Sequence, residues 1–462
     1  MIGFEQAIEG IDAYEPRACR GTVDAVRGMT ILVRQLKAPV GAVVMIERGS
    51  GTSGQGVYGE VIGFDCDRAI VMLLGSAGGT GPGDRVLLKR TSGSIMVGDS
   101  WLGRVLDGLG RPIDGKPHPS GLVSRELYPQ ATNPMSRGEI RTPLTTGVRA
   151  IDGLLTLGRG QRVGIFAGPG VGKSTLMANI AHGTNAEVTV IALVGERGRE
   201  VKEFIRNALG KEGMARSVVV AATGDESPLR RVRAMAAAIA AAEHFRDAGR
   251  HVLLMVDSLT RFAQAQRQIG LAAGEQPATK GYTPSVFSLL PQMLERAGTI
   301  DGGGSITGIH TVLVEGDDMT DPIADAALSV LDGHVVLSRK LASRGHFPAI
   351  DPLESISRVA DQVCEESHIV AKRRILELMA AHRENSELIS IGAYARGSNP
   401  MTDTAIECEA GITGFLRQES GELSAMPETC GALLGLAAQS ESIRQAALSR
   451  AGVQTAQIPA GN

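Results

Sequence analysis

The first part of the chain carries short hydrophobic runs that glycine-rich turns separate at close intervals. Four such runs, each containing β-branched residues, lie at positions 21–26, 43–46, 59–64 and 69–74. This spacing is typical of strands that form a small antiparallel barrel. We therefore expect an N-terminal β-barrel domain over residues 18–90.

From residue 91 to residue 360 the pattern changes to buried strands that alternate with helices. Several strand candidates are continuous apolar runs without polar alternation, as expected when both faces of a sheet are covered. The candidates lie at 163–166, 188–194, 217–222, 251–256, 306–314 and 335–338. This alternation predicts an α/β fold with a doubly wound parallel sheet.

One helix between two of these strands is marked at both ends. Ser227 can cap it, Pro228 occupies its first turn, and Gly249 lies just past its end. Its middle, residues 234–242, is nearly all alanine, so we expect this helix to lie close to the sheet.

The third region, residues 361–462, has a helical pattern. We expect helices around 370–382 and 428–450. The chain should therefore end in a C-terminal helical domain.

Composition narrows the classes of function. The chain has 462 residues, a net charge of −3 and 3% aromatic residues, which does not favour a nucleic-acid-binding surface. No apolar segment approaches the roughly 18–20 residues that span a bilayer, and the first residues lack the pattern of a secretory signal. The five cysteines show no metal-binding spacing. We expect a cytoplasmic protein with reduced thiols.

The segment A-G-P-G-V-G-K-S-T at 167–175 carries the strongest chemical signal. It follows a buried strand and opens a helix-compatible run, as a phosphate-binding Walker A loop does. Its backbone N–H groups would face a polyphosphate, the Lys173 ammonium would bridge the outer phosphates, and the Ser174 hydroxyl would bind Mg²⁺. The predicted nucleotide contacts are Gly168, Pro169, Gly170, Val171, Gly172, Lys173, Ser174 and Thr175. A glycine-rich turn that binds nothing is the alternative, but Lys-Ser at this spacing rarely occurs by chance.

Two acidic residues end neighbouring predicted strands. Asp257 follows 251–256 and can hold the Mg²⁺ shell through water, because ligands bind at the carboxyl edge of such sheets. Glu196 ends the run 192–195, one strand over, and can orient or deprotonate the attacking water. The alternatives are a helix N-cap for Asp257 and a solvated salt-bridge cluster for Glu196.

Four further residues are weaker candidates. Arg197 and Glu200 follow Glu196 in G-E-R-G-R-E and could hold it and the metal-bound waters in place. Arg358 reads as a surface arginine by its local sequence alone. Phe347, which precedes Pro348, could stack on a base or pack in the core.

Taken together, the motifs resemble the ATPase of the bacterial flagellar and type III secretion export apparatus, a family similar to the catalytic subunit of rotary ATP synthases. The resemblance is dense from about 90 to 420. Its motifs are G-P-G-V-G-K-S-T, G-E-R-G-R-E, V-D-S-L-T-R-F-A, G-E-Q-P-A-T-K-G-Y-T-P-S-V-F, V-E-G-D-D-M-T-D-P-I-A-D and L-D-G-H-V-V-L-S-R. The fourth, at 274–287, is the most specific, because it separates export ATPases from synthase subunits.

The resemblance implies a RecA-like P-loop ATPase domain over 91–360 that binds ATP and Mg²⁺ at the subunit interfaces of a homohexamer. Arg358 then matches the arginine finger that acts on the neighbouring subunit's nucleotide, and Glu196 matches the catalytic carboxylate with Arg197 beside it. Phe347 falls at an adenine-contacting aromatic position. Phe415 falls near a second such position, but Glu419-Ser420-Gly421 follow where synthase subunits carry another phenylalanine, so the adenine clamp could be weaker.

The resemblance also implies protein partners and a location. A coiled-coil stalk protein would thread the central pore and touch the loop at 275–284, which could otherwise be a plain surface loop. The segment 1–17 would bind a dimeric negative regulator. Phe4, Ala7, Ile8 and Ile11 form one apolar stripe there, although the chain's own barrel could cover it. Export-gate and chaperone–substrate contacts would place the protein at the cytoplasmic face of the inner membrane.

Other functions stay open beside export. A non-catalytic ring subunit would keep Walker A but replace the carboxylate of G-E-R, and Glu196 argues against it. A nucleic-acid helicase would need basic, aromatic-rich surfaces. A rotary synthase subunit and a virulence injectisome ATPase are the remaining alternatives to the flagellar system.

Overall fold

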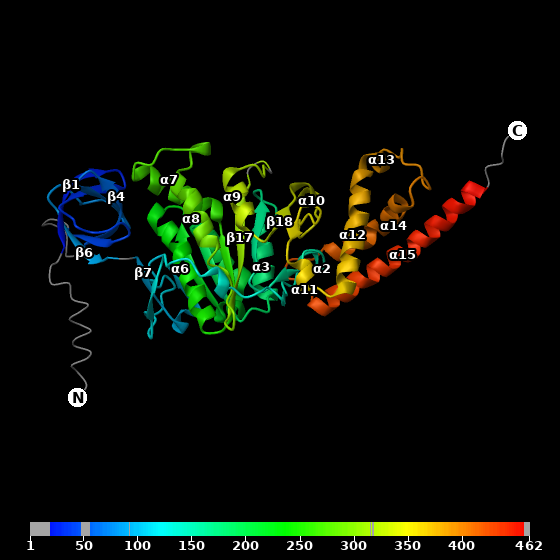
Figure 1. Ribbon diagram of the computed structural model, residues 1–462, viewed down its shortest axis with the longest axis horizontal. Coiled ribbons are helices and arrows are strands. Elements are labelled where there is room, and N and C mark those ends of the chain that lie inside the picture. Colours follow the sequence, from blue (N-terminus) through cyan, green and yellow to red (C-terminus); the bar gives the residue numbers. More distant parts are fainter. Residues whose placement is uncertain (1–18, 48–55, 92, 315, 317, 457–462) are drawn as a thin grey trace, which may run out of the picture.

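The computed structural model describes residues 19–47, 56–91, 93–314, 316 and 318–456. Its three parts lie in a row, with a β-barrel at one end, a helix-covered sheet in the middle and a group of helices at the other end (Figure 1). This arrangement confirms the predicted fold class. The predicted stripe in segment 1–17 lies outside the described residues.

The barrel is closed by six strands in the order β1-β2-β5-β4-β3-β6, all antiparallel to their neighbours. Apolar side chains from these strands, among them Val23, Ile31 and Val61, fill its interior. The hydrophobic pattern missed β2 and β6, whose apolar runs are only three residues long and are flanked by polar residues. The strands are β1 (Arg20–Arg27), β2 (Thr30–Arg34), β3 (Val43–Glu47), β4 (Val57–Asp65), β5 (Arg68–Leu73) and β6 (Arg85–Arg90).

The segment 94–158 leads from the barrel to the inner strands of the central sheet. It contains a small antiparallel pair formed by β7 and β9. The side chains of Glu60 on the barrel and Arg233 on α6 are both buried and form an ion pair at 2.7 Å. Besides β8 of the central sheet, the elements of the segment 94–158 are β7 (Ser94–Val97), η1 (Asp99–Trp101), β9 (Val123–Glu126), η2 (Pro134–Ser136), β10 (Pro143–Leu144), α2 (Arg149–Leu154) and β11 (Leu157–Gly158).

The central sheet has the order β19-β18-β12-β17-β15-β13-β14-β8, and its strands are parallel from β18 to β8. All six predicted strands are present. Two edge strands of two and three residues, β19 and β8, were too short for a hydrophobic run to mark. The strands are β8 (Arg104–Leu106), β12 (Arg162–Ala167), β13 (Val188–Glu196), β14 (Ser217–Thr223), β15 (His251–Asp257), β16 (Gly298–Thr299), β17 (Ser305–Leu313), β18 (Gly333–Leu337) and β19 (Ile356–Ser357).

Each face of this sheet has its own hydrophobic core, which explains the continuous apolar strands. Alternate residues of β13 point to opposite sides: Val190 joins the core under α6, whereas Ile191 joins the core under α3. The nearly all-alanine middle of α6 is fully buried, as its composition predicts. The covering helices are α3 (Lys173–Gly183), α4 (Gly198–Glu203), the π-helical segment η3 (Phe204–Leu209), α5 (Gly210–Ala215), α6 (Pro228–Asp247), α7 (Leu259–Ala272), η4 (Thr279–Gly281), α8 (Pro284–Leu294), α9 (Pro322–Val330) and α10 (Arg339–Ser343).

The C-terminal part consists of helices joined by loops. The helices α12, α14 and α15 pack on one another and on α2 (Figure 1). The helices are α11 (Ala360–Val363), α12 (Glu366–Glu384), α13 (Ser386–Ser390), α14 (Pro400–Leu416) and α15 (Met426–Ala456). Among the described residues, no helix combines the length and the hydropathy that a bilayer crossing needs.

Candidate active site

The predicted phosphate loop lies between β12 and α3, at the carboxyl edge of the sheet. Gly170 and Gly172 adopt positive φ angles of 78° and 91°, which glycine accepts without strain. Gly172 is also the residue that precedes the first turn of α3. Because β12 is an inner strand between β17 and β18, the loop projects from a rigid, fully buried base.

Lys173 stands between the two predicted carboxylates. Its ammonium contacts Asp257 Oδ1 directly and lies 3.8 Å from Glu196 Oε1. The strands β15 and β13 are neighbours, and they end at the same edge as the loop. A cation, two acids and a glycine loop therefore share one small volume, where the lysine can exchange carboxylate partners for phosphate oxygens.

Asp257 is only 5% exposed, and its Oδ1 accepts a 2.6 Å hydrogen bond from the Thr311 hydroxyl. The alternative of a helix cap does not hold, because Ser258 is the N-cap of α7 and its hydroxyl accepts from the Arg261 N–H. Asp257 is thus a fixed acid that points into the site. Nothing in the sequence singled out Thr311, which lies on β17, the strand beside β15.

Glu196 is 7% exposed and so is not part of a solvated cluster. Burial, and then the nearby charge of Asp257, raise the pKa of Glu196 to about 7, while Lys173 and Arg261 act in the opposite direction. A carboxyl group with that pKa can accept a proton near neutral pH. The site therefore contains a group suited to general-base chemistry.

Arg261, rather than Arg197, holds the backbone and side chain of this acid. Its Nε lies 3.2 Å from Glu196 Oε1, and its Nη1 donates to the Gly195 carbonyl at 2.5 Å. Arg197 instead points outward and pairs with Glu200 at 3.2 Å, so it does not hold Glu196 as the sequence suggested. Arg261 lies in the first turn of α7, just after β15, and its contact with Glu196 depends on which strand lies beside β15, so no spacing in the sequence indicated it.

A cavity of about 270 Å³ opens beside the loop. Both acids line it, together with Ser174 and Thr175 from the first turn of α3, Glu200 from α4 and Ser420. Hydroxyl and carboxylate oxygens are the ligands that Mg²⁺ prefers. The donor set therefore fits the predicted magnesium site of Ser174, Asp257 and Glu200.

The two predicted adenine-contacting rings lie in different surroundings. Phe347 is 43% exposed, and its ring stands about 3.5 Å from where a side chain on Gly172 would begin, so it covers the end of the phosphate loop. Phe415 is 7% exposed and packs against Gly153 of α2 within the core. Phe347 is free to stack on a base, whereas this position of Phe415 does not favour a base contact.

Arg358 follows the edge strand β19, far from Glu196 of the same chain. Four strands separate β19 from β13, a distance of roughly 24 Å at the usual strand spacing. The Arg358 N–H donates to the Asp332 carbonyl at the amino end of β18, whereas the phosphate loop projects from the carboxyl ends. The exposed Arg358 side chain cannot reach the site of its own chain.

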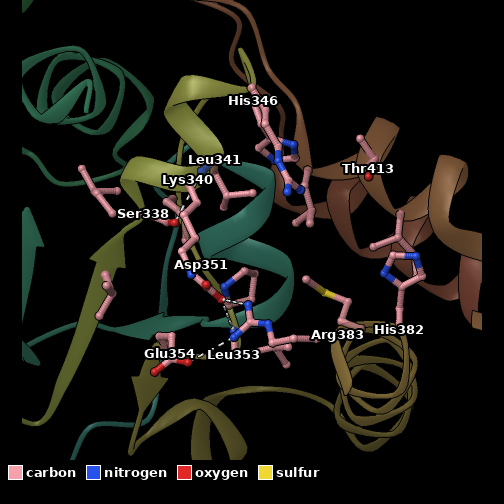
Figure 2. Close-up of a pocket in the computed structure, with 18 of the residues that line it drawn as sticks. Ser338, Lys340, Leu341, His346, Asp351, Leu353, Glu354, His382, Arg383 and Thr413 are labelled. Carbon is pink, nitrogen blue, oxygen red and sulfur yellow. Dashed lines mark hydrogen bonds and ion pairs between the residues drawn. The ribbon is translucent and has the colours of Figure 1, made fainter. Parts of the chain in front are cut away.

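A larger cavity, of about 800 Å³, lies between the central sheet and the C-terminal helices (Figure 2). Arg383 of α12 spans it and pairs with Asp351 at 2.5 Å and with Glu354 at 3.1 Å. None of the predicted site residues lines it. The smaller cavity, beside the phosphate loop, is therefore the candidate active site.

Comparison with protein families matches two parts of the chain. Residues 147–357 match the nucleotide-binding domain of the ATP synthase alpha/beta family. Residues 364–435 match the T3SS EscN ATPase C-terminal domain. The first match contains the phosphate loop, both carboxylates and Phe347, and the second contains Phe415.

Whole-length relatives cover most of the chain. It is 50% identical over 406 residues to the flagellum-specific ATP synthase of Salmonella typhimurium, which covers 86% of this chain and 89% of the relative. It is 47% identical to the type 3 secretion system ATPase of Xanthomonas euvesicatoria, with 88% and 92% covered. A solved structure of the assembled ATPase EscN with its central stalk EscO, from enteropathogenic E. coli, is 42% identical with a TM-score of 0.83, and the match covers 90% of this chain and 100% of that one.

Proposed function

The chain belongs to the family of flagellum-specific ATP synthases and type 3 secretion system ATPases, and from that premise we propose that it hydrolyses Mg-ATP to drive or assist the unfolding and export of flagellar proteins. The observation that carries the enzymatic part is the Lys173 ammonium held between Asp257 and Glu196 beside the glycine loop. Because relatives from both systems are similarly close, an injectisome ATPase is the second candidate. Restored motility in a strain that lacks the gene supports the flagellar role, and restored effector secretion without motility supports the other.

In this proposal each residue of the site has a separate role in phosphoryl transfer. The N–H groups of 168–172 and the Lys173 ammonium bind and orient the phosphates. Bound Mg²⁺, near Ser174, Asp257 and Glu200, would neutralise charge on the outer phosphates. Glu196 orients water and accepts its proton, and Arg261 keeps that carboxylate in place. Phe347 supplies a face for the adenine base.

Two substitutions separate binding from turnover. Lys173→Ala removes the phosphate-pairing charge and should impair both nucleotide binding and hydrolysis. Glu196→Gln keeps the size of the side chain but removes its basicity, so binding should stay near wild type while turnover falls by roughly 10²-fold or more. Binding is measured with a fluorescent nucleotide and turnover by phosphate release. Wild-type turnover in Glu196→Gln would falsify the assignment.

We further infer that the protein acts as a homohexamer with a stalk partner. Arg358, which is out of reach of its own site, would act as an arginine finger on the nucleotide of the next subunit. The loop at 275–284, between α7 and α8, would line the central pore and touch the stalk. The EscN structure, assembled with its central stalk, supports this arrangement by similarity.

The remaining partners are proposed from the family alone. The segment 1–17 would bind a dimeric negative regulator, and the assembly would meet export-gate and chaperone–substrate complexes at the cytoplasmic face of the inner membrane. Deletion of residues 1–12 should abolish regulator binding without lowering the melting temperature. A protein that still binds the regulator after this deletion would exclude that role for the segment.

A further inference from the structure

Two thiols and an imidazole meet away from the nucleotide site, where α2 contacts the C-terminal helices. His368 is buried in α12, and its Nε2 lies 2.7 Å from the Gly153 carbonyl of α2. A carbonyl oxygen can only accept a hydrogen bond, so Nε2 carries a hydrogen. In the neutral ring Nδ1 is therefore the free acceptor.

Both thiols contact this ring. Cys430, in the first turns of α15, has its sulfur 3.6 Å from His368 Nδ1. Cys364 lies just before α12, four residues ahead of His368, and interacts electrostatically with the same imidazole and with Thr156. Each thiol is only partly buried, so a small oxidant can reach the cluster.

The surroundings make the two thiols unequal. Burial by itself raises the pKa of Cys364, but hydrogen bonds with His368 and Thr156 outweigh it and leave that pKa below its ordinary value. The nearby Lys372 acts in the same direction. Burial, and then the charge of Cys364, raise the pKa of Cys430. A partly exposed thiol whose pKa is lowered beside an imidazole and a lysine is typical of reactive cysteines, and Cys430 can act as its resolving partner.

We propose that Cys364, His368 and Cys430 form a peroxide-sensitive dithiol site, in which a hydroperoxide oxidises Cys364 and Cys430 then closes a disulfide with it. Two of the other described cysteines provide the contrast. Cys66 is exposed and Cys408 is buried, and no imidazole contact is seen for either in the described part of the chain. The proposal does not depend on the export function.

The chemistry balances in two steps. The Cys364 thiolate attacks one peroxide oxygen, so that an S–O bond forms and the O–O bond breaks. The leaving oxygen takes the proton from the His368 imidazolium, and the products are a sulfenic acid and water or an alcohol. Cys430 then gives its proton to Nδ1, and its sulfur attacks the sulfenic sulfur. The S–S bond forms, the S–O bond breaks, and hydroxide leaves with that proton as water.

The disulfide would join the start of α12 to the start of α15. Both helices pack on α2, which precedes β12 and the phosphate loop. Closure needs the two sulfurs to come within about 2 Å of each other.

The test exposes the full-length protein to hydrogen peroxide and follows each cysteine by mass spectrometry. We expect a Cys364–Cys430 disulfide in the wild type, formed at least tenfold faster than any oxidation of Cys66 or Cys408. In Cys430→Ser, a sulfenic acid at Cys364 should accumulate and react with dimedone. In Cys364→Ser, Cys430 should stay reduced. His368→Asn should slow oxidation of Cys364 about tenfold or more.

Controls distinguish the site from a general thiol effect. Cys66→Ser should leave the rate and the product unchanged, and reduced Cys364→Ser and Cys430→Ser should keep the wild-type melting temperature and basal ATPase. Equal oxidation of all thiols overturns the proposal. So does a sulfenic acid on Cys364 in the wild type that never resolves to the disulfide, or an unchanged rate in folded His368→Asn.

Discussion

The pKa of Glu196 connects the geometry of the site to a measurable pH dependence. In the free enzyme this carboxyl has a pKa of about 7, because it is buried and faces Asp257. A base works only when it is deprotonated, and kcat/KM reports the free enzyme. We therefore expect kcat/KM to fall about tenfold per pH unit below that value. Steady-state ATPase assays from pH 5.5 to 8.5 measure this profile.

The Glu196→Gln protein is the control. It should lose the fall of kcat/KM below about pH 7 that Glu196 causes and keep only the pH dependence that the substrate and other groups contribute.

The stability of the folded protein gives an independent check, because it should decrease with rising pH over the range in which kcat/KM increases. Between pH 4.5, the ordinary value, and about 7, the native Glu196 binds more proton than the unfolded one, so its contribution to stability is lost as pH rises. The melting temperature of wild type relative to Glu196→Gln should fall over that window. A constant difference would contradict the raised pKa.

Some residues of the site were predictable from their spacing, and others were not. Lys173 follows from the loop motif, because the phosphate-binding geometry allows few sequences. Asp257 follows from its place at the end of a buried strand. Thr311 was not predictable, since its contact with Asp257 depends on which strand lies beside β15. The role predicted for Arg197 is filled by Arg261. Arg197 is next to Glu196 in the sequence, whereas Arg261 comes next to Glu196 only in the folded chain.

At the scale of elements, the sequence patterns predicted best where burial was strongest. The six inner strands are largely apolar on both faces, the middle of α6 is nearly all alanine, and all could be located from the sequence alone. The edge strands β8 and β19 are short and half-polar, so their pairing depends on the finished sheet.

The loop at 275–284 has one anchored end and one exposed side chain suited to a test. Glu275 accepts the Ser285 N–H at 3.0 Å, and Lys280 lies 3.5 Å from Asp318, so changes at either residue would disturb the loop itself. Gln276 is exposed. If the loop touches the stalk, Gln276→Ala should lower stalk-stimulated ATPase, through a loss of about 1 kcal/mol or roughly fivefold in stalk affinity.

Basal ATPase should stay at the wild-type level in Gln276→Ala, since the change lies outside the nucleotide site. Lys211→Ala, which alters an exposed residue of α5, is the matched control and should leave both rates unchanged. Titration of the stalk protein against each variant measures the affinity. An unaltered stalk response in Gln276→Ala would show that this part of the loop is not the contact.

At the scale of the whole molecule, one chain holds a phosphate loop with two carboxylates and, out of their reach, the arginine proposed to act on a neighbouring subunit. Glu196 lies at the carboxyl edge of the sheet, and Arg358 lies beyond β19, roughly 24 Å away by strand count. An arginine side chain cannot bridge that gap, so a finger role requires a neighbour. Arginine fingers contribute about 10³–10⁵ in rate, and Arg358→Ala should therefore be nearly inactive although its own carboxylates and loop are intact.

Mixing two inactive proteins tests this arrangement directly. Arg358→Ala keeps Glu196, and Glu196→Gln keeps Arg358. In a ring assembled at random from equal amounts, about one quarter of the interfaces would carry both intact groups, because each side is correct half of the time. We expect the mixture to recover up to roughly a quarter of wild-type ATPase if interfaces act independently. Differently tagged chains that co-purify establish that mixed rings form. If such rings stay as inactive as their parents, Arg358 is not an arginine finger for the next subunit, because a site shared between subunits would let the two defects complement each other.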